Sequence, residues 1–465
     1  MPQSFGFETY LSPLSWRYGS PEMRRIFSIK HKHELWRKIW VTLAEVEEQA
    51  GIISKSELAD LKKNQDKLNI ERILELEKTT RHDVVAAIRE FSEIAKVGGA
   101  KIHLGATSMD IVDNAEMLCI QEALALIITQ VRNLLATFAK QIQAYAALVC
   151  MGYTHLQPAE PTTVGYRLSF YAQDLLIDWE FLQFVTKTIA AKGMKGAVGT
   201  RASFSVLLQG TKMTAESLDE RVMKKLGLSV VLIANQVYTR KFDYLVLAAL
   251  NSIASTIAKF ASDVRILQSP LYGEWSEPFG STQVGSSAMP FKKNPINSEK
   301  ICSLSRFVNQ LPPVALENAT LSFMERTLDD SANKRLIISQ AFLAVDEILI
   351  TAGKILSGLV VYKERISLNL AQFAPFSATE SILIAAVKKG GNRQILHEQL
   401  RHLSLQAWNA VQQGKVNPLP ELLKNDTQVR TYLQVREIMA LLDITHHIGD
   451  APKRALKLAR QLKKL

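Results

Sequence analysis

Residues 106–151 read ATSMDIVDNAEMLCIQEALALIITQVRNLLATFAKQIQAYAALVCM, a stretch without glycine or proline. Its apolar residues recur at the spacing of one helix face. Three further segments without these helix breakers follow at 166–192, 228–269 and 314–352. Because helices of this length exceed the usual size in globular proteins, the four segments predict an all-α fold built around a bundle of long helices.

The rest of the chain divides around this bundle. Shorter helices are expected at about 31–50, 54–66 and 69–78, and glycine and proline breaks become frequent after about residue 362. We therefore expect three domains: an N-terminal helical domain at 1–110, the central long-helix bundle at 111–362 and a C-terminal helical domain at 363–465. Apolar residues spread around the bundle helices, which predicts packing against other subunits as well.

Composition, net charge and cysteine count indicate what kind of protein this is. The chain has 465 residues, of which 47% are hydrophobic and 22% charged, as in an ordinary globular protein. Its net charge of +11 fits either acidic small-molecule substrates or a nucleic acid. Three widely spaced cysteines indicate a reducing compartment without disulfides or structural zinc, and residues 1–20 do not resemble a secretory signal. The most apolar stretch, 244–258, is shorter than a membrane span, so we expect a cytoplasmic protein.

A loop rich in small and basic residues follows the third long segment. Residues 285–299 read GSSAMPFKKNPINSE. Gly285 and the serines give a mobile backbone with N–H donors, and Lys292 and Lys293 add positive charge. Pro295 is expected to be the first residue of a helix, whose N-terminus favours an anion. Composition alone also fits a surface turn, but the ordered pattern SSxMPxKxNPxxxE resembles the signature of the fumarase/aspartase superfamily of lyases.

Two motifs of the N-terminal region admit two interpretations each. Arg17 and Tyr18 precede a helix that Ser20 is expected to cap, so they fit either a phosphate site or an exposed arginine beside a packed tyrosine. His82, between an arginine and an aspartate, fits either a tuned acid or phosphate ligand, or an ion-paired helix start.

Two later motifs are equally open. The stretch GYTHLQPAEPTT, residues 152–163, is expected to be a loop entering a helix, and its His155 is either an acid or base or a locally bonded side chain. The stretch ERTLDDSANKR, residues 325–335, lies inside the fourth long segment, where ion pairs on a solvated face are the ordinary interpretation. Arginines inside a buried bundle would need an anionic partner, which favours a binding site.

Taken together and in order, RYGSPEM, TRHD, GATSMD, GYTHLQPAEPTT, the signature loop and ERTLDDSANKR resemble the adenylosuccinate lyase family over residues 12–401. The superfamily loop alone also allows fumarase, aspartase, argininosuccinate lyase or muconate cycloisomerase. The resemblance implies a C–N lyase of purine biosynthesis. Such an enzyme eliminates fumarate from adenylosuccinate to give AMP, and from succinylaminoimidazole-carboxamide ribotide to give AICAR. It uses no metal or redox cofactor.

The resemblance also implies residue roles. Ser286 is the base on the loop, His155 the general acid for the purine nitrogen, Lys292 a source of positive charge and Glu299 the partner that orients His155. The remaining implied residues bind the nucleotide, its phosphate or the succinyl group: Arg17, Tyr18, Arg81, His82, Asp83, Thr107, Ser108, Gln236, Arg326, Ser331 and Arg335. In this family each active site is shared between three subunits of a homotetramer. Partners are therefore expected to be anionic nucleotides, without nucleic acid or membrane.

Three other functions remain open from the sequence. Another superfamily member, such as an argininosuccinate lyase, would use a different substrate. A catalytically silent bundle protein is disfavoured because Ser286, Lys292, His155 and Glu299 are all present. Nucleic-acid binding through the net charge and the basic C-terminal stretch 452–464 would show steep salt dependence, although a solvated terminal helix explains that stretch as well.

Overall fold

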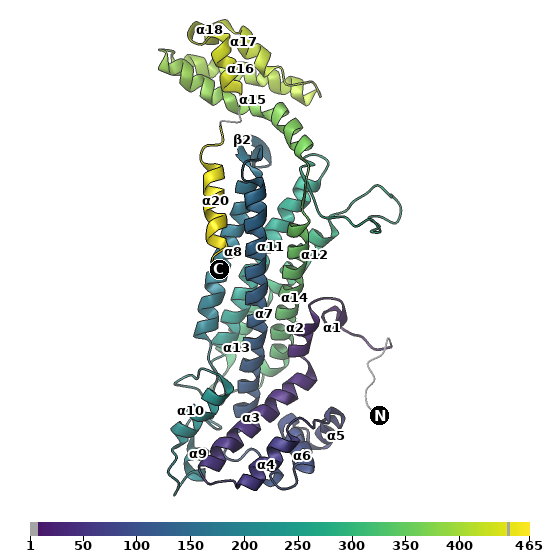
Figure 1. The fold of residues 1–465 in the computed structure, drawn as a ribbon, viewed down its shortest axis with the longest axis vertical. Helices are drawn as coiled ribbons and strands as arrows, with labels where there is room; N and C mark the ends of the chain where they lie inside the picture. Colours follow the sequence, from purple (N-terminus) through teal and green to yellow (C-terminus); the bar gives the residue numbers. More distant parts are fainter. Residues whose placement is uncertain (1–7, 444–446) are drawn as a thin grey trace. The chain divides into compact units, whose positions relative to one another are not determined.

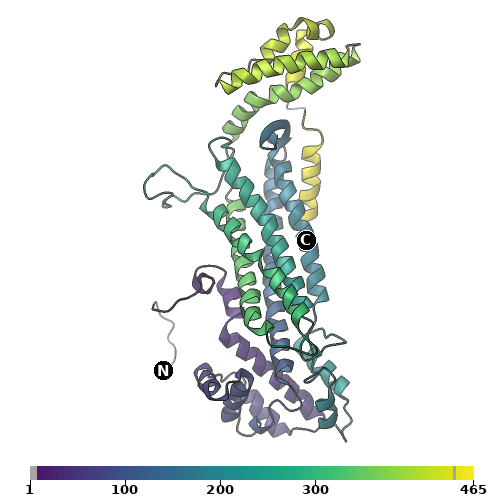
Figure 2. The same ribbon diagram turned by 180° about the vertical axis from the view of Figure 1, so that it is seen from behind.

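A computed structural model describes residues 8–443 and 447–465. The fold is mostly helical, as expected, and is shown from two sides in Figures 1 and 2. The chain forms two compact units. Unit 1 comprises residues 1–131, 178–255 and 303–350, and unit 2 comprises residues 132–177, 256–302 and 351–465. The predicted three-domain boundaries are a different division of the chain and stay a prediction.

The helices are α1 Pro13–Trp16, α2 Pro21–Ile26, α3 Ile29–Gln49, α4 Lys55–Asn64, α5 Ile70–Thr80, α6 Asp83–Ile94, α7 Ser108–Tyr145, α8 Val164–Thr188, α9 Ala202–Leu207, α10 Ala215–Leu226, α11 Lys241–Gln268, α12 Ile296–Val308, α13 Leu311–Leu321, α14 Asp330–Ser357, α15 Lys363–Lys388, α16 Arg393–Gln412, α17 Leu419–Asn425, α18 Thr427–Tyr432, α19 Val435–Leu442 and α20 Ala451–Leu462, with a 3₁₀ turn, η1, at Gly99–Lys101. The strands are β1 Val149–Thr154, β2 Gln157–Thr163, β3 Trp275–Ser276 and β4 Val360–Val361.

In unit 1 the three predicted N-terminal helices are confirmed as α3, α4 and α5. Side-chain caps define their starts, because Ser28, Ser54 and Asn69 each accept a backbone N–H from the first turn. Ser20 caps α2 in the same way, as predicted. The buried face of α3 includes Trp36, packed edge-on against neighbouring aromatic rings, so this unit has its own core.

In unit 2 the helices α15 to α19 enclose a separate apolar cluster that includes Ile382, Leu400 and Leu419. Beside it, β1 and β2 form an antiparallel hairpin that contacts α15. The basic C-terminal helix α20 buries its apolar side, with Ala455 and Ala459 fully covered, and lies alongside α8 in both views (Figures 1 and 2). It is therefore a packed amphipathic helix.

Three of the four long segments are interrupted where the sequence has no breaker. The first ends as a helix at Tyr145 and continues into β1, and the third becomes helical only at Lys241. The fourth is split into α13 and α14 by the irregular residues 322–329. The expectation of four uninterrupted helices is wrong at these places, although α7, α8, α11 and α14 remain the long helices of the fold.

Helix α11 is also longer than the apolar stretch 244–258 suggested. Among the described residues, α11, α14 and α15 are long and apolar enough to cross a membrane, judged by length and composition alone. The protein itself buries 50% of the apolar window in α11, 67% in α14 and 22% in α15. Among the apolar side chains of α15, Leu368 and Ile384 are exposed within one chain.

Candidate active site

The predicted site residues divide between the two units. All eleven predicted substrate-binding residues lie in unit 1, and the four predicted catalytic residues lie in unit 2.

The corner that carries Arg17 and Tyr18 joins α1 to α2. It is anchored to α14, because the Gly19 N–H donates to the Glu347 carboxylate at 3.0 Å. The Arg24 guanidinium also donates to the carbonyl oxygen of Tyr18 at 3.1 Å. Arg17 is exposed and Tyr18 is partly buried, so a fixed backbone presents the Arg17 guanidinium, which lies 5.8 Å from the Trp16 ring centroid, to solvent.

Two of the predicted binding motifs meet at Asp83. Arg81 ends α5 with a left-handed backbone, φ 51°, and Asp83 is the first residue of α6. The Asp83 carboxylate lies 3.8 Å from the Lys32 ammonium and 3.8 Å from the Arg335 guanidinium. Burial lowers the pKa of Lys32, against the opposing effect of Asp83. Several cations therefore surround a single carboxylate, which suits an anionic ligand.

Gln236 and Arg326 also meet in unit 1. The Arg326 guanidinium donates to the Gln236 side-chain oxygen at 2.9 Å, and the Gln236 N–H donates to the Glu325 carbonyl at 3.4 Å. Arg326 lies in the irregular residues before α14, so only the later part of the motif 325–335 is helical. The expectation that arginines of this motif lie inside a buried bundle is wrong for Arg335, whose side chain is 70% exposed.

Asp330 and Lys334 of the same motif belong to a buried ionic cluster instead. The Asp330 carboxylate accepts from Arg240 at 2.7 Å, and the Lys334 ammonium donates to the Tyr238 hydroxyl at 2.8 Å. Although burial opposes it, the nearby Asp113 carboxylate holds the pKa of Arg240 well above its usual value. Ser331 and Arg335 of the same motif lie outside this cluster, and Arg335 is paired with Asp83 instead.

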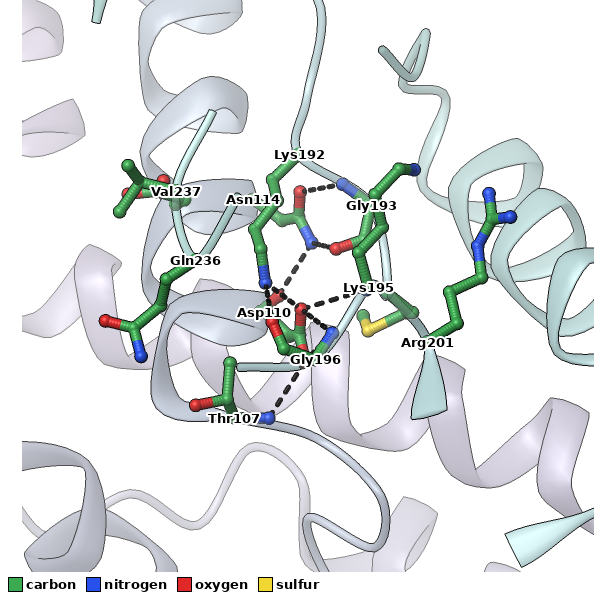
Figure 3. Close-up of polar contacts among 12 residues, drawn as sticks. Thr107, Asp110, Asn114, Lys192, Gly193, Lys195, Gly196, Arg201, Gln236 and Val237 are labelled. Carbon is green, nitrogen blue, oxygen red and sulfur yellow. Dashed lines mark hydrogen bonds and ion pairs between the residues drawn. The ribbon is translucent and has the colours of Figure 1, made fainter. Parts of the chain in front are cut away.

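Thr107 and Ser108 form the start of α7 beside a buried carboxylate (Figure 3). The Thr107 N–H donates to Asp110 at 2.9 Å, and the same carboxylate accepts N–H groups of Lys195 and Gly196 at 3.1 Å. The Lys192 ammonium completes this shell. Asp110 thus fixes the backbone from which Thr107 and Ser108 project.

In unit 2, His155 occupies the two-residue turn of the β1–β2 hairpin. His155 and Leu156 both have positive φ, 54° and 61°, which is the backbone of a tight hairpin turn. The expectation of a loop is therefore wrong, because the segment pairs as strands, although it does enter a helix, α8, at Val164 as expected. The Tyr272 hydroxyl donates to the Leu156 carbonyl at 2.9 Å and so fixes the turn, while the His155 side chain is exposed.

The signature loop is folded on itself. A Cβ at Gly285 would lie 2.0 Å from the Lys292 carbonyl oxygen, so the closure requires glycine. The Asn294 amide donates to the Gly285 carbonyl at 3.0 Å. The Ser286 hydroxyl oxygen accepts the N–H groups of Ala288 and Met289 at 3.3 and 3.1 Å. Two donors therefore point at the atom that would carry negative charge if this serine lost its proton.

The start of α12 differs from expectation. Pro295 lies immediately before the helix, and Glu299 lies in its first turn. The N–H groups of Asn297 and Ser298 donate to the Glu277 carboxylate at 3.2 and 2.5 Å. This internal carboxylate occupies the helix N-terminus, so the expectation that these donors serve a substrate anion is wrong.

The four predicted catalytic residues are not joined to one another within the chain. In the part of unit 2 that the structure describes, no hydrogen bond or ion pair links His155, Ser286, Lys292 and Glu299, and Lys292 and Glu299 are exposed. The loop and the hairpin each hold their residue in a defined local conformation.

One group of described side chains offers three possible metal ligands. The ligand atoms of Glu160, Glu380 and His447 lie within 4.8 Å of one another. Both glutamates are exposed, and such acidic groups are commonly hydrated rather than metal-bound. This group contains none of the predicted site residues.

The buried charged residues that hold the loop 192–201 in unit 1 were not identified from the sequence. Asp219 accepts the Met194 N–H at 2.7 Å, the Lys195 ammonium at 2.8 Å and the Arg201 guanidinium at 2.8 Å. Burial lowers the pKa of Lys195, although Asp219 opposes this. The sequence does carry a signal for this loop: glycines at 193, 196 and 199 alternate with basic residues. This pattern would have indicated a tight loop held by ion pairs.

Comparisons with known proteins agree with this architecture. A protein-family model described as Lyase matches residues 16–309, and one described as Adenylosuccinate lyase C-terminus matches residues 375–456. Among solved structures, a fumarate lyase from Mesorhizobium sp. BNC1 has a TM-score of 0.84 at 22% identity, covering 97% of this chain and 99% of that one. A 3-carboxy-cis,cis-muconate lactonizing enzyme from Pseudomonas putida has a TM-score of 0.85 at 23% identity, covering 97% and 100%. These two structures support the fold alone.

Sequence relatives are closer. Adenylosuccinate lyase of Saccharomyces cerevisiae is 38% identical over 98% of this chain and 95% of the relative. Adenylosuccinate lyase of Schistosoma mansoni is 39% identical over 96% of this chain and 93% of the relative. Because the similarity runs through both units and reaches the C-terminal helices, the chain belongs to the lyase family and, within it, to the adenylosuccinate lyases.

Proposed function

We propose that the chain eliminates fumarate from adenylosuccinate, leaving AMP, and acts on succinylaminoimidazole-carboxamide ribotide in the same way to leave AICAR. The observation that carries the proposal is its similarity, over nearly the full length, to proteins named adenylosuccinate lyase. The second substrate contains the same succinyl group on nitrogen, so the same bond would break.

Elimination requires three chemical roles. A base removes the weakly acidic C–H proton beside a carboxylate, the resulting aci-carboxylate needs positive charge, and the leaving nitrogen needs a proton. We assign these roles to Ser286, Lys292 and His155. The two N–H groups on the Ser286 oxygen support the first role, since they would stabilise a partial oxyanion. Glu299 is assigned to orient His155 and favour its protonated form.

The substrate-binding role rests on the charges of unit 1. Adenylosuccinate carries two carboxylates and a phosphate, and Arg17, Arg81, Arg326 and Arg335 are guanidinium groups suited to such anions. The Asp83–Arg335 and Arg326–Gln236 contacts support the idea that the two ends of this set share one ligand. His82, Thr107, Ser108 and Ser331 would supply hydrogen bonds to its neutral parts.

A homotetramer with shared active sites is the assembly that we propose. Two observations support it: in the part of unit 2 that the structure describes, no hydrogen bond or ion pair joins the four catalytic residues, and only 22% of the apolar window of α15 is buried within the chain. Apolar helix surface of this kind is usually covered by another subunit. A cytoplasmic location is proposed because Cys119, Cys150 and Cys302 are free and buried.

Fumarate release by the purified protein tests the function. Adenylosuccinate and argininosuccinate are supplied in parallel, with a Ser286→Ala variant as control. We expect fumarate from adenylosuccinate alone, and loss of that signal in the variant. Fumarate from argininosuccinate, or none from either substrate by a folded protein, would contradict the proposal.

A further inference from the structure

Residues 192–201, the glycine loop, form a tight turn in unit 1 that the proposed chemistry does not use. Its three glycines, Gly193, Gly196 and Gly199, have positive φ of 88°, 76° and 82°. The Arg201 N–H donates to the Lys195 carbonyl at 2.9 Å and closes the loop. Glycine adopts positive φ without the steric cost that a Cβ would bring, so these three positions permit the tight turn.

Three buried side chains fasten the loop from outside. Asp110 accepts two of its backbone N–H groups and the Lys192 ammonium, and Asp219 accepts a third N–H and two further cations. The Asn114 amide donates to the Gly193 carbonyl at 3.1 Å and accepts the Gly193 N–H at 3.0 Å. Asp110, Asn114 and Asp219 are all fully buried, so these contacts exclude water and define one conformation.

The fastened loop is linked to two predicted substrate contacts through residues next to them. On one side, Asp110 also accepts the Thr107 N–H, so a single carboxylate joins the loop to the start of α7 (Figure 3). On the other side, the loop lies against the backbone just before Gln236. A Cβ placed at Gly199 would lie 1.9 Å from the Ala234 carbonyl oxygen and 3.3 Å from the Asn235 Cα.

We infer that the glycine loop is a positioning element, which fixes Thr107 and Gln236 relative to each other and thereby sets the width of the substrate site between them. The inference rests on the proposed function, because that function gives Thr107 and Gln236 their roles in binding substrate. The link between these two residues through the glycine loop does not depend on it. A shift of the 234–236 backbone would also disturb Arg326, which donates to Gln236. The loop acts through these residues and does not touch substrate.

The contact between the glycine loop and the backbone before Gln236 is tested with the variant Gly199→Ala. The variant Gly210→Ala is the control. Both glycines have φ of 82°, so an added Cβ introduces the same backbone strain at each. Only at Gly199 does it also meet the backbone of Ala234, because Gly210 has no atom within 4 Å of the new Cβ. The difference between the two variants therefore reports the contact alone.

Two measurements are made on each full-length variant. In hydrogen exchange, we expect faster exchange at residues 234–238 and 107–110 in Gly199→Ala than in Gly210→Ala. In fumarate release, well below the unfolding temperature of both, we expect kcat/KM for adenylosuccinate to fall about 100-fold for Gly199→Ala, with KM raised as well as kcat lowered. Gly210→Ala should stay near the wild type.

The outcomes separate the inference from the proposed function. Unchanged exchange at 234–238 and 107–110, or wild-type KM and kcat in a Gly199→Ala protein that is merely less heat-stable, would overturn the positioning role. An inactive wild type would overturn the proposed function, while the exchange data would still decide the link.

A second pair of variants tests the same role if Gly199→Ala does not fold. Asn114→Ala removes two loop contacts without a clash, and Asn318→Ala removes a buried amide pair with Asn333 elsewhere in unit 1. We expect raised KM for Asn114→Ala and wild-type KM for Asn318→Ala. Equal KM values in the two variants would overturn the positioning role.

Discussion

Ser286 presents the sharpest chemical problem, because an unassisted serine hydroxyl is far too weak to remove a carbon-bound proton. Its oxygen accepts two backbone N–H groups, an arrangement that lowers the energy of the oxyanion. We expect Ser286→Ala to reduce kcat by about 10²- to 10⁴-fold, the range of a lost general base. The adjacent Ser287→Ala is the control, measured by fumarate release, and equal activity of the two variants would remove Ser286 from its role.

His155 calls for a substitution that respects its backbone. Its φ of 54° is tolerated by asparagine better than by alanine, so His155→Asn keeps the hairpin turn while removing the acid. We expect His155→Asn and His155→Ala both to lose nearly all turnover while circular dichroism stays unchanged. Turnover near the wild type in His155→Asn would show that another group protonates the leaving nitrogen.

Glu47 is a residue whose burial should be visible in the pH dependence of stability. Burial raises its pKa to about 8, although Lys101 opposes this. The folded state therefore binds more protons than the unfolded state between about pH 4.5 and 8, and this group makes the protein less stable as pH rises through that window. We expect Glu47→Gln to raise the unfolding free energy at pH 8 by on the order of 2 kcal/mol and to change it little at pH 4.5.

Chemical denaturation at the two pH values measures this effect. The partly exposed neighbour Glu48 provides the control, since Glu48→Gln should show no comparable difference between pH 4.5 and 8. A Glu47→Gln variant whose stability runs parallel to that of the wild type across the window would contradict the expectation.

At the scale of elements, α3 and α6 are joined by a buried ion pair. The Arg37 guanidinium donates to Glu90 at 2.5 Å and to the Asn64 carbonyl at 2.8 Å, while Glu90 also accepts the Asn69 N–H at 2.9 Å. Arg37→Met leaves Glu90 buried without its cation, which should destabilise the protein by about 3 to 5 kcal/mol. Adding Glu90→Gln should restore part of this loss.

Thermal and chemical unfolding of the two single variants and the double variant measure the coupling. The exposed pair Arg72–Glu93 joins the same part of unit 1 and serves as a comparison. Arg72→Met should leave the unfolding free energy nearly unchanged because solvent screens that pair. Equal losses for Arg37→Met and Arg72→Met would contradict the role assigned to burial.

The sequence predicted the long helices better than their ends. Residues 228–240 contain no breaker, yet they are not helical, since the N–H groups of Val237 and Tyr238 donate to the side chains of Asn235 and Asp113. Asp113 lies far away in sequence, so local pattern could not reveal this competition. The hairpin was missed for a related reason: its prolines suggested a loop, whereas Pro158 and Pro161 are tolerated on an edge strand.

Candidate site residues could be proposed from the sequence only where residue type and order carry the chemistry, and their roles stay predictions. Ser286, Lys292 and His155 stand in stretches whose composition and order are unusual, so they could be named without coordinates. Asp110 was quoted within its motif, but its partner Lys192 is 82 residues further along the chain. Tertiary contacts of this kind define the supporting charges, and no local pattern specifies them.

At the scale of the molecule, we propose that each active site is shared between subunits. Mixing two inactive variants tests this proposal. Ser286→Ala and Arg335→Ala should each be inactive alone, by loss of the base and of a substrate contact. If each active site takes these two residues from different subunits, a mixed tetramer contains some sites with both intact. Random reassembly of an equal mixture should restore about a quarter of the wild-type sites. Fumarate release after dissociation and reassembly measures the recovery, and a mixture that reassembles into tetramers yet stays inactive would mean that both residues of a site come from one subunit.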